Sequence, residues 1–265
     1  MTQFHLRANS LQSGGAVQKP LHVEQSVWQS AQYRGCHYAT FAPLHYEPNY
    51  AYPLIIWLHG PRNDERQLLQ LMPFVSMRNY VSIAPRGPHY AYEEGAYEEG
   101  LSCQGLACDA DVSVVETAIF NCLEVAKARF HIASDRVFLA GYNSGGTMAF
   151  RIGLRYPHRF AGLVSLGGPF PSSHAPLARL NEARTLPLLL SCGCYSTLYP
   201  TEKACDHVRL LHAAGLKDAT LRHYECGDEL VSAMLHDMNI WIMDRITGVI
   251  SDDVQNLTSY PSDRN

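Results

Sequence analysis

The sequence lacks three features that would each have pointed to a class of function. It has no cluster of Lys and Arg: 21 basic residues stand against 25 acidic ones, which gives a net charge of -4. A face that binds phosphates needs a local excess of basic residues, so we expect no nucleic-acid partner. The chain also has no run of about eighteen apolar residues, the length of a membrane-spanning helix. Its first thirty residues show no basic start followed by an apolar stretch, the pattern of a secretion signal. We therefore expect a cytoplasmic protein with no membrane span.

Cysteine is too sparse to form a disulfide scaffold. A chain of 265 residues of which 46% are hydrophobic can bury a core without covalent staples. We therefore expect the eight cysteines to be reduced thiols. They are Cys36, Cys103, Cys108, Cys122, Cys192, Cys194, Cys205 and Cys226.

The chain divides into one domain and two tails. Residues 1–30 and 248–265 are polar and show no apolar periodicity, so we expect tails there. Residues 31–247 carry the apolar segments and are expected to form a single domain.

Within that domain, short apolar runs alternate with segments of helical periodicity. The runs predict buried strands, each followed by Gly, Pro or a polar turn. They are 54–58, 80–84, 136–140, 162–166, 186–190 and 219–224. The segments between them have apolar residues three and four apart, which predicts helices. These are 112–130, 144–156, 202–214 and 229–246. This alternation predicts an α/β fold with a mostly parallel central sheet and helices on both faces.

The most informative stretch is the end of the strand 136–140 and the helix that follows it. It reads Gly141-Tyr142-Asn143-Ser144-Gly145-Gly146. A sharp strand-to-helix turn with small residues two before and two after its central position is a nucleophile elbow, which holds one side chain above the sheet. Asn143 has glycine on both sides at that spacing, whereas Ser144 comes one residue late.

At this point the chain resembles a known family, the α/β-hydrolase fold in its phospholipase/carboxylesterase branch. This branch includes acyl-protein-thioesterase-like and polyhydroxybutyrate-depolymerase-like esterases. The resemblance runs from about Pro53 to Ile246. The segments that carry it are 57–60 (Trp-Leu-His-Gly), 84–88 (Ala-Pro-Arg-Gly-Pro), 135–141 (Asp-Arg-Val-Phe-Leu-Ala-Gly) and 155–162 (Arg-Tyr-Pro-His-Arg-Phe-Ala-Gly).

The resemblance implies a Ser–His–Asp catalytic triad, and all three of its positions are substituted here. Where the family has Gly-Phe-Ser-Gln-Gly-Gly at the elbow, this chain has Asn143. Ser196 stands where the family's aspartate belongs, and Asp228 where its histidine belongs. The reaction needs a nucleophile, an imidazole base and an acid that orients it. An Asn amide is no nucleophile, so these substitutions predict an abandoned active site.

A second interpretation is that Ser144 has become a shifted nucleophile. It would need a base, and the candidates are Asp228, His223 on the strand before the old histidine loop and His236 in the last helix. A lone carboxylate suits a serine hydroxyl less well than an imidazole does at neutral pH.

Four residues are expected to line the former pocket: His59, Gly60, Tyr142 and Gly145. In the family, the His-Gly pair opens the loop that supplies an amide to the oxyanion hole. A backbone amide survives side-chain changes, so an anion-binding hole can persist without a nucleophile. The alternative is that His59 only caps a buried strand.

Cys192, Cys194 and Cys226 follow neighbouring strands, and thiolates are zinc ligands. Cys-x-Cys is not a common structural zinc spacing and buried cysteine usually acts as a small apolar side chain. We therefore expect no metal and no cofactor.

The segment 91–100 repeats Ala-Tyr-Glu-Glu-Gly. It is either a solvated surface loop or the docking element of a protein-interaction module. Taken together, the sequence predicts a catalytically degenerate esterase-family protein that binds an unknown protein partner or small ligand. The alternatives are an active serine carboxylesterase or thioesterase using Ser144, and an interaction module using 91–100.

Overall fold

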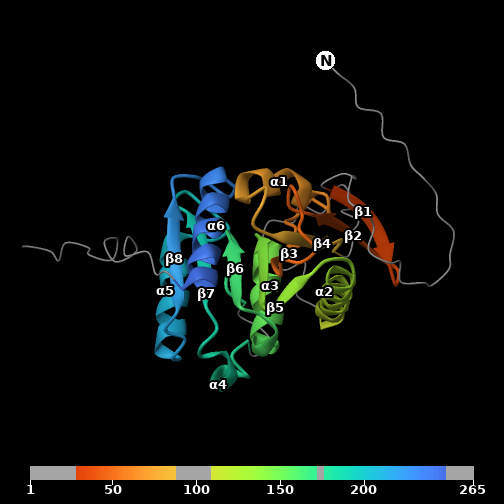
Figure 1. Ribbon diagram of the computed structural model, residues 1–265. Helices are drawn as coiled ribbons and strands as arrows, with labels where there is room; N and C mark the ends of the chain where they lie inside the picture. Colours follow the sequence, from red (N-terminus) through yellow and green to blue (C-terminus); the bar gives the residue numbers. More distant parts are fainter. Residues whose placement is uncertain (1–27, 88–108, 172–175, 249–265) are drawn as a thin grey trace, which may run out of the picture.

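The computed structural model describes residues 28–87, 109–171 and 176–248. The eight strands in these residues form one sheet (Figure 1). They are β1 (Trp28–Tyr33), β2 (Cys36–Phe41), β3 (Tyr52–Leu58), β4 (Val81–Pro85), β5 (Ile132–Tyr142), β6 (Gly162–Leu166), β7 (Leu188–Gly193) and β8 (Ala219–Tyr224).

The strand order is β1-β2-β4-β3-β5-β6-β7-β8. The β1–β2 and β2–β4 pairs are antiparallel and the remaining pairs are parallel. All seven residues of β3 are buried, which explains its continuous apolar run. The predicted mostly parallel sheet is confirmed.

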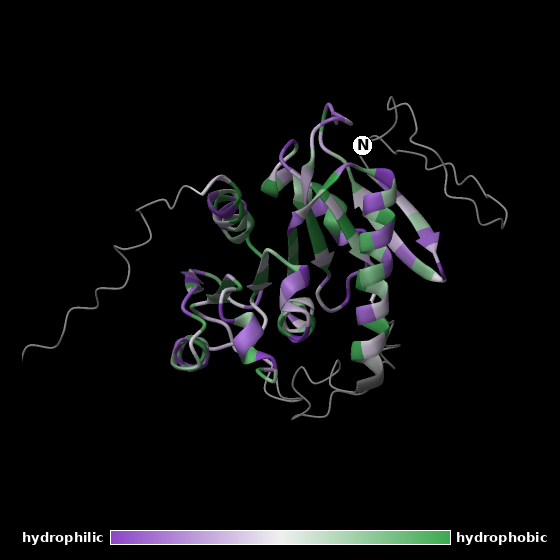
Figure 2. Cartoon of the chain, turned by 60° about the horizontal axis from the view of Figure 1, so that its bottom comes forward, coloured by the Kyte–Doolittle hydropathy of each residue, from purple (hydrophilic) through white to green (hydrophobic). Residues whose placement is uncertain are grey.

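Helices cover both faces of the sheet, as predicted. One apolar core packs α1 and α6 against the sheet, and a second packs α2, α3 and α5 against the other face. Figure 2 shows the hydrophobic residues gathered in the strands between these layers. The helices are α1 (Gln67–Val75), α2 (Asp109–Arg129), α3 (Ser144–Arg155), α4 (Leu180–Ala183), α5 (Thr201–Ala213) and α6 (Ser232–Thr247), with a 3-10 turn, η1 (Pro157–Arg159), after α3.

The β1–β2 hairpin was not among the strands predicted from the sequence. β1 begins at Trp28, inside the segment expected to be a tail. Arg34 and Gly35 form its two-residue turn, and both have positive φ (50° and 79°), as a type I′ hairpin turn requires. The glycine at the second position was the sequence signal for this turn. The tails predicted at either end fall mainly in 1–27 and 249–265, outside the described residues.

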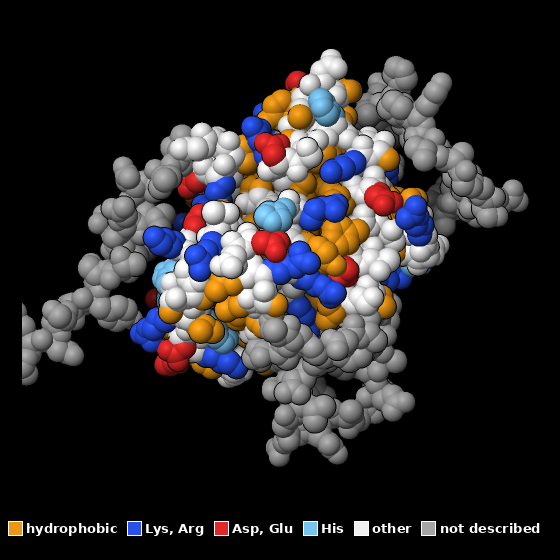
Figure 3. All heavy atoms as spheres, turned by 90° about the horizontal axis from the view of Figure 1, so that it is seen from below, with side chains coloured by type: hydrophobic (Ala, Val, Ile, Leu, Met, Phe, Trp, Pro, Cys, Tyr) orange, Lys and Arg blue, Asp and Glu red, His pale blue; other side chains and the backbone are white. Residues whose placement is uncertain are grey.

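The charged side chains on the face seen in Figure 3 carry both signs, side by side. Arg155 and Glu116 approach to 3.4 Å, as do Arg179 and Glu182. None of the described helices has the length and apolar character that a membrane crossing requires.

Candidate functional site

The turn between β5 and α3 has an unusual backbone conformation at Asn143. Its φ is 51° and its ψ is -119°. The backbone on either side is tied down: the Asn143 N–H donates to the Leu166 carbonyl (2.9 Å), and the Asn143 carbonyl accepts from the Thr147 N–H (3.0 Å). A residue held in a sparsely populated region at a strand-to-helix turn is the geometry of a nucleophile elbow. The residue in that conformation is Asn143, and Ser144 is the first residue of α3.

The flanking glycines make this turn possible. A Cβ on Gly141 would overlap the backbone of Gly145, and a Cβ on Gly145 would overlap the carbonyl oxygen of Leu58. Glycine at these positions therefore allows the turn to press against its own helix and against the end of β3.

Asn143 is largely buried as a residue, but its side-chain amide has no hydrogen-bond partner among the described residues and reaches solvent. The residue is 6% exposed, and its amide makes no hydrogen bond to any other described residue, not even as a cap for α3. Asn normally caps a helix by accepting from its second or third amide. Neither amide atom is among the fully buried side-chain atoms of the described residues that lack a partner, so the amide is left open to solvent.

The structure brings Ser196 and Asp228 into contact. The Ser196 hydroxyl donates to Asp228 Oδ1, which also accepts from the Leu198 N–H at 3.2 Å. Asp228 Oδ2 accepts from the Thr197 hydroxyl at 2.8 Å and from the Thr197 N–H at 3.3 Å. Both carboxylate oxygens are thus occupied by the turn at 196–198.

These contacts make Asp228 a poor base. Burial raises its pKa, but the hydrogen bonds from Ser196, Thr197 and Leu198 outweigh that effect and hold the pKa below its usual value. A carboxylate with a lowered pKa and two occupied oxygens takes up a proton less readily.

Tyr142 joins the elbow to two neighbouring loops. Its hydroxyl donates to the backbone carbonyl of Asp228, and its ring lies so close to Gly60 that a Cβ there would overlap it. Burial raises the pKa of the Tyr142 phenol. The elbow, the loop after β3 and the loop after β8 therefore meet at the carboxyl ends of the strands.

The loop after β3 offers few amides for an anion. The Gly60 N–H donates to Gln67 Oε1 at 3.3 Å, and that oxygen also accepts from Trp57 Nε1 at 3.0 Å. The next residue, Pro61, has no N–H. Neither Gly60 nor Pro61 thus provides a free donor of the kind that an oxyanion hole uses.

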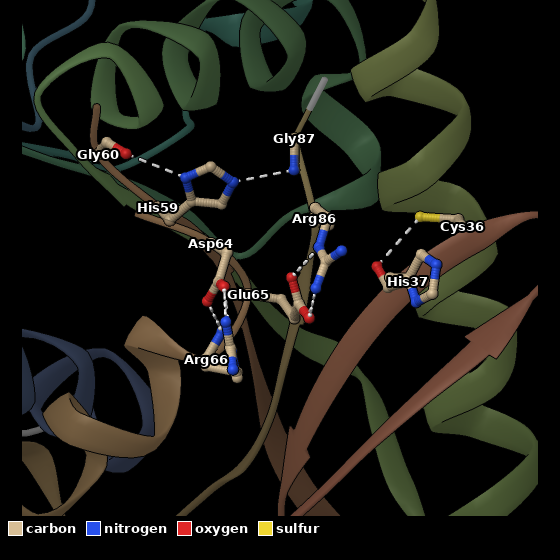
Figure 4. Close-up of polar contacts among 9 residues, drawn as sticks. All are labelled: Cys36, His37, His59, Gly60, Asp64, Glu65, Arg66, Arg86 and Gly87. Atoms are coloured by element: carbon tan, nitrogen blue, oxygen red, sulfur yellow. Dashed lines mark hydrogen bonds and ion pairs between the residues drawn. The ribbon is translucent and has the colours of Figure 1, made fainter. Parts of the chain in front are cut away.

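His59 acts as a brace between two loops. Its Nε2 accepts from the Gly87 N–H at 2.9 Å, so Nδ1 carries the proton and donates to the Gly60 carbonyl at 3.0 Å (Figure 4). Beside it, Arg86 forms two 2.6 Å hydrogen bonds with the fully buried carboxylate of Glu65. These contacts favour the interpretation of His59 as a structural residue.

The other candidates are not drawn together. His223 and His236 are both exposed, and neither is hydrogen-bonded to Ser144 within the described chain. Across the described ranges, no group of three or more His, Cys, Asp or Glu could hold a metal ion, and Cys192, Cys194 and Cys226 are free thiols. The segment 91–100 lies outside the described residues.

The residues that hold this site together were not predicted from the sequence. Thr197 and Leu198 contribute through contacts with Asp228 that no motif announces. Gln67 begins α1, which has the apolar spacing of a helix at Leu68, Leu71, Met72 and Val75. Pro73 inside that stretch obscured the pattern, since proline ordinarily ends a helix.

One family model matches most of the chain, and partial matches relate it to esterases and thioesterases. A sequence model described as Phospholipase/Carboxylesterase matches residues 48–245. Acyl-protein thioesterase 1 of Schizosaccharomyces pombe is 31% identical over 77 residues, which are 29% of this chain and 34% of that protein. A second curated relative is matched over 25% of its own length, so the match spans only about a third or a quarter of these proteins.

Solved structures share the fold. The carboxylesterase of Bacillus cereus has a TM-score of 0.62 and 18% identity, with 80% of this chain and 95% of that chain covered. The acyl-protein thioesterase 2 of Zea mays has a TM-score of 0.59 and 17% identity, covering 79% and 98%.

Proposed function

The chain belongs to the phospholipase/carboxylesterase family, and we propose that it is a catalytically degenerate member that acts by binding a protein partner or a small ligand. The observation that carries this proposal is the identity of the elbow residue: the backbone conformation φ 51°, ψ -119° belongs to Asn143. An amide at that position cannot attack an ester carbonyl.

The surroundings of Asn143 support the same conclusion. Asp228, at the position of the family's histidine, has both carboxylate oxygens engaged by the 196–198 turn. In the loop expected to contribute to the oxyanion hole, the Gly60 N–H already donates a hydrogen bond to Gln67 Oε1. Loss of one such donor lowers kcat by about 10²–10³ in enzymes that use it. Nucleophile, base and part of the oxyanion hole are therefore all compromised.

The unpaired Asn143 amide is what the site still offers to a ligand. It has a donor and an acceptor, and both reach solvent at the meeting point of three loops. A small molecule with a carbonyl and a hydroxyl or amide could satisfy both. Ligand at about 100 times its Kd would raise the free energy of unfolding by about 2.7 kcal/mol, which a thermal-shift measurement with ethyl lactate, an ester that also carries a hydroxyl, can detect.

The test of degeneracy is covalent labelling with a fluorophosphonate probe, read as intact mass. We expect no adduct on the wild-type protein beside a labelled, active carboxylesterase. An adduct on Ser144 that disappears in Ser144→Ala would overturn the proposal, because the protein would then be an enzyme with a shifted nucleophile.

A restored triad tests the placement of the three positions. The variant combines Asn143→Ser, Ser196→Asp and Asp228→His. Because residues 196 and 228 already share a hydrogen bond, we expect the new acid and imidazole to pair and the new serine to be labelled. The single variant Asn143→Ser is the matched control and should remain unlabelled. A folded triple variant that takes up no probe would contradict this assignment of the former triad.

A further inference from the structure

The backbone at Asn143 has a consequence for its own side chain. Because Cα is tetrahedral, Cβ is offset from the backbone nitrogen by about 120° around the Cα–C bond. A ψ of -119° therefore nearly eclipses the Asn143 Cβ with the Ser144 nitrogen. A five-membered ring that joins Asn143 Cγ to this nitrogen contains the Cα–C bond and requires that eclipsed arrangement.

We propose that Asn143 is a site of spontaneous deamidation, which gives the elbow a carboxylate. The Ser144 backbone nitrogen loses its proton to solvent hydroxide and attacks Asn143 Cγ. An N–Cγ bond forms, the bond from Cγ to the side-chain nitrogen breaks, and that nitrogen takes a proton from water and leaves as ammonia. One water molecule then opens the succinimide by adding its hydroxyl to Cγ and a proton to the Ser144 nitrogen. The net reaction converts an amide and water into a carboxylic acid and ammonia. This inference does not depend on the proposed function.

The attacking nitrogen is available. Ser144 is the first residue of α3, and its N–H has no hydrogen-bond acceptor among the described residues, as is usual in the first turn of a helix. No hydrogen bond has to break before the attack. The positive end of the helix also stabilises the negative charge of the deprotonated nitrogen and, later, of the carboxylate.

The carboxamide is equally unrestrained. Since it makes no hydrogen bond to the described residues, its rotation toward the Ser144 nitrogen is opposed only by packing and by the modest cost of leaving a preferred rotamer. Asn121 provides a contrast of similar burial, at 9% exposure. It lies inside α2, where a ψ of about -42° leaves Cβ and the next nitrogen about 80° apart.

The packing of the turn also favours one product. Opening of the ring at the backbone carbonyl would give isoaspartate and add a methylene to the main chain. Gly141 and Gly145 are already pressed together with no room for a single Cβ. We therefore expect the folded protein to yield normal aspartate, whereas an unconstrained chain yields both forms.

The experiment compares the wild-type protein under native conditions and in urea, in one mildly alkaline buffer. Samples taken over time are digested and analysed by mass spectrometry for succinimide, seen as loss of ammonia, and for acid at position 143. The variant Asn143→Asp supplies the product standard. The dipeptide Asn9-Ser10 has the same local sequence, so in urea it should react as fast as Asn143, and Asn121 should stay intact in the native protein.

We expect Asn143 to react roughly five to thirty times faster in the native protein than in urea, the factor gained when one residue's backbone is already fixed. A native rate equal to or below the rate in urea would overturn the proposal. It would mean that burial of the site outweighs the eclipsed backbone.

Discussion

Replacement of Asp228 by Asn should destabilise the protein through the turn at 196–198. The substitution keeps one acceptor oxygen but replaces the other by an NH2 group, so two of the four hydrogen bonds to Asp228 are lost. A hydrogen bond to a charged group contributes about 1.5–3 kcal/mol when buried. Because Thr197 and Leu198 are exposed, solvent screening reduces this to about 1 kcal/mol each. We therefore expect a loss of about 2 kcal/mol.

The assay is urea unfolding at neutral pH, with Asp206→Asn as the matched control. Asp206 pairs only with Arg209 on the surface, at 2.8 Å with both side chains more than two-thirds exposed, so its loss should cost less than about 0.5 kcal/mol. Equal midpoints for the two variants would refute the structural role of the Asp228 carboxylate.

The pH dependence gives a second check with a definite sign. The native pKa of Asp228 lies below the usual value of 3.8, so the native state binds its proton less readily than the unfolded state does. The stabilisation is therefore complete above the unfolded pKa and is lost as the pH falls through the native pKa. The difference in free energy of unfolding between wild type and Asp228→Asn should therefore be largest at neutral pH and should decrease as the pH falls below 3.8, the usual pKa of aspartate. A gap that widens in acid would contradict the argument.

Two further predictions concern the framework of the site. Arg86→Ala leaves the Glu65 carboxylate, which is 0% exposed, buried without its partner. We expect urea unfolding to show a loss of about 3–5 kcal/mol for this variant. Arg66→Ala is the matched control: it breaks the 2.6 Å pair between the exposed Arg66 and the partly buried Asp64, and should lower the unfolding midpoint much less. Gly141→Ala forces a Cβ into the backbone of Gly145 and should cost more than about 2 kcal/mol, measured as a lower unfolding midpoint; an unchanged midpoint would show that the turn can relax.

The central strands were predictable because they are buried on both faces. In β3 and β4 every residue is buried, so their sequences are continuous apolar runs whatever lies around them. The β1–β2 hairpin lies at the edge of the sheet and mixes polar with apolar residues. Its clearest local signal was the turn at Arg34-Gly35. The hairpin is held in the sheet by the pairing of β2 with β4, which the local sequence does not reveal.

The candidate site was predictable where it depends on backbone shape. The spacing of Gly141 and Gly145 pointed to Asn143 as the centre of the turn, and the backbone angles there agree with it. The contacts of Asp228 with Thr197 and Leu198 could not be anticipated, because they depend on how two loops from different strands meet. Family resemblance indicated the positions but not what the substituted side chains do to each other.

In a nucleophile elbow the flanking glycines are required by packing, whereas reactivity depends on the side chain at the centre of the turn. Gly141 and Gly145 are required by close packing of β5, α3 and the end of β3, so they are needed whether or not the central residue reacts. The side chain of Asn143 is under no such constraint, and the strained backbone beneath it costs of order 1–3 kcal/mol. In a serine hydrolase that strain is offset by the reaction it permits. Packing of these glycines is therefore sufficient to preserve the geometry of the turn, whether or not the residue at its centre takes part in a reaction.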